Sequence, residues 1–155
     1  MLPVYFANMA PPFVEYWSGW NRPISQRWLG EHKTVMGFLL GMAVATMTAF
    51  VQSLIAWRDG LAQYDRWLAL GLACGIGGLA GDALKSLVKR RLGIAPGKSW
   101  LPADQLDFGI GGLAALSFFV TLKPVDVALI LAVSFLGDIG VNHLSFQLGI
   151  RDTKW

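Results

Sequence analysis

The chain has 155 residues, of which 54% are hydrophobic and only 15% are charged. Soluble globular domains carry about 25% charged residues, so a disordered chain is excluded and an ordinary soluble domain is disfavoured. We predict an all-α integral membrane protein with one domain over residues 1–155. The formal net charge of +3 fits the basic cytoplasmic loops of such a protein, and nucleic-acid binding is not expected.

Five segments with few charges predict a bundle of about five transmembrane helices. The first, residues 1–14, lacks the basic start of a signal peptide and carries three prolines, so we expect a short, kinked first span. The second, residues 34–57, is long enough by itself, because a spanning helix needs about 20 apolar residues. The last three spans start at residues 67, 108 and 127. They reach that length only if charged residues lie within or at the ends of the helices: Asp82, Asp107 and Asp138.

Glycines recur four residues apart within two of these segments, as in Gly37/Gly41, Gly71/Gly75 and Gly77/Gly81. Small residues at this spacing let helix backbones approach closely in lipid. We therefore expect tight packing between the second and third spans and their neighbours.

The loops between the five spans differ in positive charge. Alternate loops place ten Lys and Arg residues on one side of the membrane and three on the other. The positive-inside rule assigns the richer side to the cytoplasm. The ten residues are Arg22, Arg27, Lys33, Lys85, Lys89, Arg90, Arg91, Lys98, Arg151 and Lys154, and the three are Arg58, Arg66 and Lys123. The sequence thus predicts a multi-pass protein of the cell (inner) membrane.

Polar residues from four spans converge on the cytoplasmic end of the bundle. Ionisable groups in a membrane usually face a bundle interior or a water-filled cavity, so we predict a polar cavity there. Asp82, Lys85, Ser86 and Lys89 share one helix face by their spacing, and Asp104 and Asp107 share another. Lys33 and Thr34 start the second span, where backbone N–H groups favour phosphate, and Asn142 lies in the later half of the fifth.

Carboxylates on adjacent helices suit Mg²⁺, which takes one or two carboxylates and completes its shell with water and phosphate oxygens. The predicted metal ligands are Asp82, Asp104 and Asp107. Two simpler readings remain open. Asp82 and Lys85 could form a structural ion pair, and the run 89–91 could be a topology signal that contacts anionic lipid headgroups. The sequence shows no nucleophile motif, so the substrate itself would supply the nucleophile.

Residues 81–94 (GDALKSLVKRRLGI) and 102–108 (PADQLDF) resemble the signature of the CDP-archaeol synthases, small membrane relatives of the phosphatidate cytidylyltransferases. Three further segments are similar to the family pattern: 8–11 (NMAP), 29–37 (LGEHKTVMG) and 142–155, which ends in Trp155. The resemblance covers nearly the whole chain in order. It departs in the first loop, where Pro23-Ile24-Ser25 replaces Pro-Ile-Asp and the following insert is shorter. This difference leaves the lipid substrate open.

The resemblance implies a Mg²⁺-dependent cytidylyltransferase that joins CTP to a lipid phosphate and releases pyrophosphate, with its active site facing the cytoplasm. The implied catalytic residues are Asp82, Lys85, Lys89, Asp104 and Asp107. The implied substrate-binding residues are Lys33, Thr34, Ser86, Arg90, Arg91, Gln105 and Asn142. Besides CTP and the lipid phosphate, the expected partner is membrane lipid. The sequence leaves open whether the protein is a homo-oligomer.

Two alternatives stay beside this expectation. The enzyme could act on phosphatidate with ester-linked chains and make CDP-diacylglycerol. A non-enzymatic small channel or scaffold would also explain the spans and the charge bias. It would not explain why one loop region carries Asp, Lys, Ser, Lys-Arg-Arg and Asp-Gln-x-Asp in that order.

Overall fold

The computed structural model describes residues 1–15, 21–30, 33–55, 64–95 and 98–147. All regular elements in these ranges are helical, which confirms the all-α class. The helices are α1 (Leu2–Met9), α2 (Pro11–Glu15), α3 (Gln26–Leu29), α4 (Val35–Leu54), α5 (Trp67–Arg91), α6 (Ala103–Leu116) and α7 (Pro124–Gln147), with a 3₁₀ turn at Tyr64–Arg66. Predictions on His32, Arg58, Arg151, Lys154 and Trp155 lie outside the described residues.

Helices occupy all five segments predicted to span the membrane. Three of the described helices, α4, α5 and α7, are long and apolar enough to cross a bilayer. At 1.5 Å per residue, α1 is about 12 Å long and α6 about 21 Å, against a hydrocarbon core of about 30 Å. The first span is thus broken into α1 and α2 between Met9 and Pro11, which agrees with the predicted kink.

Helices α5 and α6 pack with their backbones in contact, as the glycine spacing predicts. A Cβ atom at Gly81 would lie 2.2 Å from the Asp107 carbonyl oxygen, and one at Gly111 would lie 2.1 Å from the Gly77 carbonyl oxygen. No side chain fits at either position without moving a backbone. This close approach brings the end of α5 beside the first turns of α6, where the predicted carboxylates lie.

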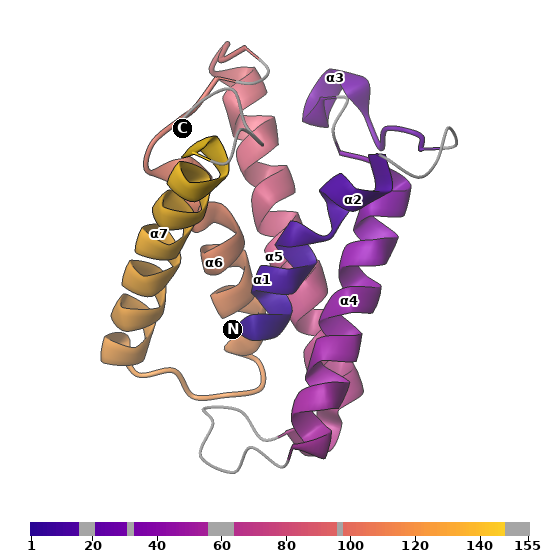
Figure 1. The fold of residues 1–155 in the computed structure, drawn as a ribbon, viewed down its shortest axis with the longest axis vertical. Helices are drawn as coiled ribbons and strands as arrows, with labels where there is room; N and C mark the ends of the chain where they lie inside the picture. The colour runs from indigo at the N-terminus through magenta and orange to yellow at the C-terminus, as the bar shows by residue number, and fades with distance from the viewer. Residues whose placement is uncertain (16–20, 31–32, 56–63, 96–97, 148–155) are drawn as a thin grey trace.

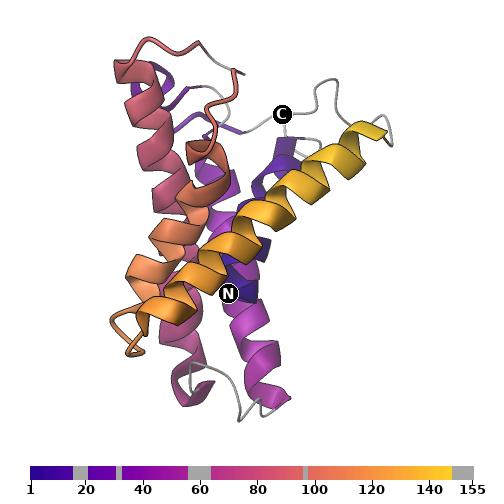
Figure 2. The same cartoon turned by 90° about the vertical axis from the view of Figure 1, so that its left-hand side faces the viewer.

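Helix α1 fills the centre of the bundle and contacts α4, α5 and α6 (Figure 1). Its Val4 is fully buried, and its methyl groups lie against Gly78 and Gly112. Helix α7 runs obliquely past the other helices (Figure 2) and packs mainly on α6. A hydroxyl contact of 2.9 Å between Tyr5 and Ser134 joins α7 to α1.

One end of the molecule gathers the start of α4, the short helix α3 and the end of α5 (Figure 1). Two backbone hydrogen bonds fasten the chain before α3 to the chain before α4. The Ile24 N–H donates to the Lys33 carbonyl at 2.7 Å, and the Val35 N–H donates to the Arg22 carbonyl at 3.1 Å. Lys33 and Thr34 are therefore held in a defined position at this end.

Candidate active site

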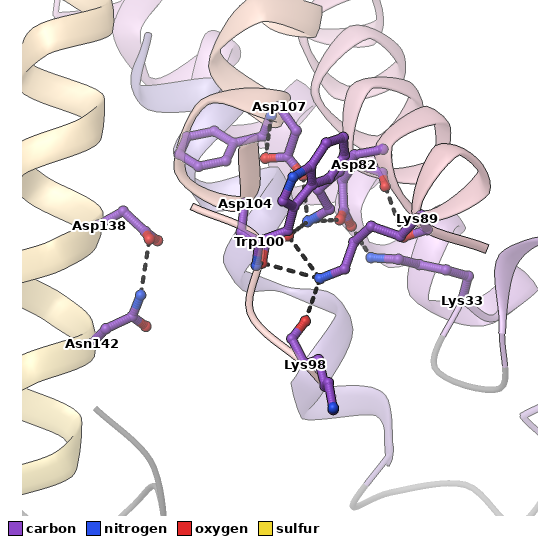
Figure 3. A network of polar contacts seen from close by, with 12 residues as sticks. Lys33, Asp82, Lys89, Lys98, Trp100, Asp104, Asp107, Asp138 and Asn142 are labelled. Carbon is purple, nitrogen blue, oxygen red and sulfur yellow. Dashed lines mark hydrogen bonds and ion pairs between the residues drawn. The ribbon is translucent and has the colours of Figure 1, made fainter. Parts of the chain in front are cut away.

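Lys85 lies at the centre of three carboxylates. Its Nζ is 3.2 Å from Asp82 Oδ1, 3.2 Å from Asp104 Oδ1 and 2.6 Å from Asp107 Oδ2. Asp82 and Lys85 are three residues apart on one face of α5. Asp104 and Asp107 lie in the first turns of α6 (Figure 3). The structure thus brings together the three aspartates that the sequence predicts as metal ligands.

A second lysine fixes the connection between α5 and α6. The Lys89 ammonium group lies 3.1 Å from both carboxylate oxygens of Asp104 and donates to the Lys98 carbonyl at 2.5 Å (Figure 3). An ammonium group has three N–H donors, so these partners can use all of them. Lys89 therefore links α5 to the chain that leads into α6.

The first turn of α6 holds Asp104 in place from the other side. The Trp100 backbone N–H donates to Asp104 Oδ2 at 2.5 Å. Burial by itself would raise the pKa of Asp104, but this hydrogen bond and the ammonium groups of Lys89 and Lys85 hold the pKa below its ordinary value. Asp104 is therefore ionised at neutral pH.

Lys33 reaches the cluster from the start of α4 and pairs with Asp82 (Figure 3). The next residue, Thr34, caps α4: its hydroxyl oxygen accepts from the Gly37 N–H at 3.1 Å. On α5, the Ser86 hydroxyl donates to the Asp82 carbonyl at 2.9 Å, which turns its hydrogen back into the helix. Thr34 and Ser86 thus support the backbone beside the cluster.

The remaining predicted site residues lie around the cluster. Gln105 is buried on α6, and its Oε1 has no hydrogen-bond partner among the described residues. On α7, Asn142 donates to Asp138 at 2.8 Å, and Figure 3 shows this pair to one side of the cluster. Arg90 donates to the Ile94 carbonyl, and Arg91 lies over the Trp28 ring. The structure therefore does not bring Arg90 and Arg91 into contact with the carboxylates.

The donor set of the cluster suits a hard cation. Three carboxylates already converge on one positively charged atom, Lys85 Nζ, within 2.6–3.2 Å. Mg²⁺ prefers such oxygen ligands. Within the described residues, no three His, Cys, Asp or Glu side chains are arranged as a ready metal site. In this structure the Lys85 ammonium group occupies the position between the three carboxylates.

Two contacts of the cluster involve backbone groups that the sequence does not single out, the Lys98 carbonyl and the Trp100 N–H. Spacing rules concern side chains on regular helices, and both groups lie in the irregular connection before α6. The segment between Leu92 and Pro102 carries Gly93 with φ of 73°, which marks a turn but gives no contact partners. These partners follow only from the folded geometry.

The fold and this cluster define an intramembrane helical protein with a carboxylate–lysine centre at one end of the bundle. The family model of CarS-like CDP-archaeol synthases matches residues 1–155. The chain therefore belongs to the CDP-archaeol synthase family, as the motifs at 81–94 and 102–108 predict.

Individual relatives agree with this assignment over most or all of their length. The chain is 31% identical to the CDP-archaeol synthase of Thermococcus kodakarensis, covering 100% of this chain and 92% of the relative. It is 32% identical to that of Aeropyrum pernix, covering 88% of the relative, and 31% identical to that of Methanospirillum hungatei, covering all of it.

A solved structure, described as an intramembrane enzyme for archaeal membrane lipids biosynthesis, superposes with a TM-score of 0.77 at 30% identity. The match covers 92% of this chain and 89% of that chain. Together with the three long apolar helices, this shows that the protein is a multi-pass membrane protein with the fold of that enzyme.

Proposed function

We propose that this protein is a CTP-dependent cytidylyltransferase that converts a lipid phosphate into a CDP-activated lipid of the CDP-archaeol type and releases pyrophosphate. The observation that carries the proposal is the convergence of Asp82, Asp104 and Asp107 on one cation, Lys85, in a chain matched over its whole length by this family.

The reaction needs no nucleophile from the protein. A phosphate oxygen of the lipid attacks the α-phosphorus of CTP, a new P–O bond forms, and the bond to the β-phosphate breaks to release pyrophosphate. Catalysis then consists of positioning the two phosphates and neutralising their charge. Lys33 and Lys85 are the cations that would contact phosphate oxygens, because both lie in the cluster with side chains partly open to solvent.

The balance of charge in the cluster supports a requirement for an additional cation. Three aspartates face three lysines, Lys33, Lys85 and Lys89, so the ionised cluster has a formal charge near zero. A triphosphate brings several negative charges that this cluster does not offset. Asp82, Asp104 and Asp107 would hold Mg²⁺, and the ion would supply that positive charge. Lys85, displaced from the carboxylates, would then be available to a phosphate.

The two substrates would approach the cluster from different sides. The lipid chains stay among the apolar helices, and CTP enters from the end that holds the cluster. We place this end at the cytoplasmic face, because it holds basic residues predicted to be cytoplasmic, among them Lys33 and Lys89, which contact the aspartates directly. Gln105 and Asn142 are proposed as contacts to the nucleotide or its phosphates from α6 and α7.

The proposal is tested with purified protein, CTP and Mg²⁺, offering an archaeal-type ether lipid phosphate and ordinary phosphatidate in separate reactions. CDP-lipid and pyrophosphate should appear in equal amounts with the ether lipid and to a smaller extent with phosphatidate. Product from phosphatidate alone would assign the enzyme to CDP-diacylglycerol synthesis. Absence of product from both, with no binding of CTP, would reject the enzyme reading.

A further inference from the structure

Trp28, on the short helix α3, holds two guanidinium groups. The guanidinium carbon of Arg27 lies 5.6 Å from the centre of the Trp28 ring, and that of Arg91 also lies 5.6 Å from it. Cations within about 6 Å of an indole ring are attracted by its quadrupole, and Trp is the strongest aromatic partner. One ring thus brings together two positive charges from elements that are far apart in the sequence.

This pair is separate from the active-site cluster. Arg91 follows Asp82 by nine residues, so at about 100° per residue it projects from nearly the opposite side of α5. Helix α3 packs on α5 at this end of the bundle (Figure 1). Gly30, which ends α3, lies close to the Arg90 guanidinium group, so α3 rests on two consecutive arginines of α5.

The two positive charges have no carboxylate partner in the part of the chain that the structure describes. The side chains of Arg27 and Arg91 are both exposed. Two like charges held at one ring repel each other, and an anion between them removes that repulsion. Guanidinium groups recognise phosphate by paired N–H donors, so phosphate is the anion that this arrangement fits.

The surroundings indicate that the phosphate comes from lipid. Trp28 is 45% exposed, and the apolar side chains of Ile24, four residues before it, and of Leu92, directly after Arg91, are exposed as well. Tryptophan is enriched where membrane proteins meet the headgroup layer. Basic residues next to a spanning helix attract anionic lipids. The site therefore combines an exposed tryptophan with two cations that have no ion-pair partner among the described residues, at the end of the long apolar helix α5.

We propose that Arg27, Trp28 and Arg91 form a binding site for the phosphate of an anionic membrane lipid at the bilayer surface, distinct from the site of the proposed reaction. A lipid of the surrounding membrane binds there and holds α3 against the end of α5. It does not depend on the proposed cytidylyltransferase activity.

Native mass spectrometry of the full-length protein in a neutral detergent tests the proposal, with phosphatidylglycerol as the anionic probe and phosphatidylcholine as the zwitterionic one. We expect the wild type to prefer phosphatidylglycerol. Arg27→Gln and Arg91→Gln should each weaken its binding at least about five-fold. Trp28→Leu should weaken it as much, whereas Trp28→Phe should retain most of it, because an aromatic face remains.

Arg22→Gln is the matched control, since it removes one exposed guanidinium group from the segment just before α3 and should change binding less than two-fold. Losses in Arg27→Gln and Arg91→Gln no larger than in this control would overturn the proposal, as would equal binding of both lipids by the wild type. Inorganic phosphate is added as a third probe. Complete displacement of the lipid by an equal concentration of free phosphate would show that the ligand is a soluble phosphate and would overturn the lipid assignment.

Discussion

At the scale of single residues, Lys85 balances the charge of the cluster. Its side chain is only 16% exposed and its ammonium group lies within 3.2 Å of three carboxylates. Removing one partner of a partly buried charge network leaves the others without compensation, which costs more than the network itself contributes. The stability of the cluster therefore depends on this lysine.

We predict that Lys85→Met destabilises the protein by about 2–3 kcal/mol, because three carboxylates then repel one another. Asp107→Asn in the Lys85→Met background should restore part of this loss by removing one negative charge. Thermal unfolding in detergent, followed by circular dichroism at 222 nm, measures both effects. A Lys85→Met variant as stable as the wild type would contradict the role of Lys85 as counter-charge.

The residue-scale site was largely predictable, because helical spacing is a local rule. The spacing of Asp82, Lys85, Ser86 and Lys89 predicts one face of α5, and the structure confirms it. The contact partners of the individual residues were not predictable. Lys89 bonds the Lys98 carbonyl, and Arg91 turns to Trp28, because the path of the connecting chains decides which side chains meet.

At the scale of elements, the contact between α5 and α6 positions the carboxylates of one helix against the lysines of the other. We predict that Gly111→Ala destabilises the protein by about 3 kcal/mol or more, because its Cβ would lie 2.1 Å from the Gly77 carbonyl oxygen. Gly137→Ala on α7 is the matched control. A Cβ there meets nothing within 4 Å, so the change should be neutral or stabilise by up to about 1 kcal/mol. Equal unfolding temperatures for the two variants would show that α5 and α6 do not touch as described.

The connection between α5 and α6 depends on Lys89. We predict that Lys89→Met releases this connection, because the ammonium group joins Asp104 to the Lys98 carbonyl. Backbone amides of residues 98–101 should exchange hydrogen at least about ten-fold faster, which hydrogen-exchange mass spectrometry measures. Lys98→Met keeps the carbonyl and should leave exchange unchanged. A similar increase in both variants would show that the Lys89 ammonium group does not hold this connection.

The existence and order of the helices could be predicted from uncharged runs, and the glycine spacing predicted the close packing of α5. The helix lengths and the central position of α1 could not be predicted. Residues 1–14 form two short helices, and Val4 of the first fits against Gly78 and Gly112 at the centre of the bundle. An apolar run gives no sign of this placement, because lipid and a protein interior favour the same side chains.

At the scale of the whole molecule, the orientation in the membrane follows from the distribution of positive charge. In a Cys74→Ala background, which removes the buried thiol, we predict that Ser99→Cys reacts with a membrane-impermeant maleimide only from the cytoplasmic side. Thr121→Cys, in the connection between α6 and α7, should react only from the outside. Both positions are exposed in the structure. The reverse labelling pattern in intact cells and inverted vesicles would show that the protein has the opposite orientation in the membrane.

The central claim is that the three aspartates around Lys85 carry out transfer of a cytidylyl group to a lipid phosphate. The most direct measurement uses CTP labelled at the α-phosphate and follows label in the lipid fraction of the wild type, of Asp82→Asn, Asp104→Asn and Asp107→Asn, and of a control. The control is Asp126→Asn, because Asp126 lies in the first turn of α7 and accepts only from the Lys123 N–H among the described residues, at 3.4 Å. We predict label in the lipid for the wild type and the control, and a loss of at least about 100-fold in each of the three variants. Near-normal transfer in all three, with correct membrane insertion, would contradict the account.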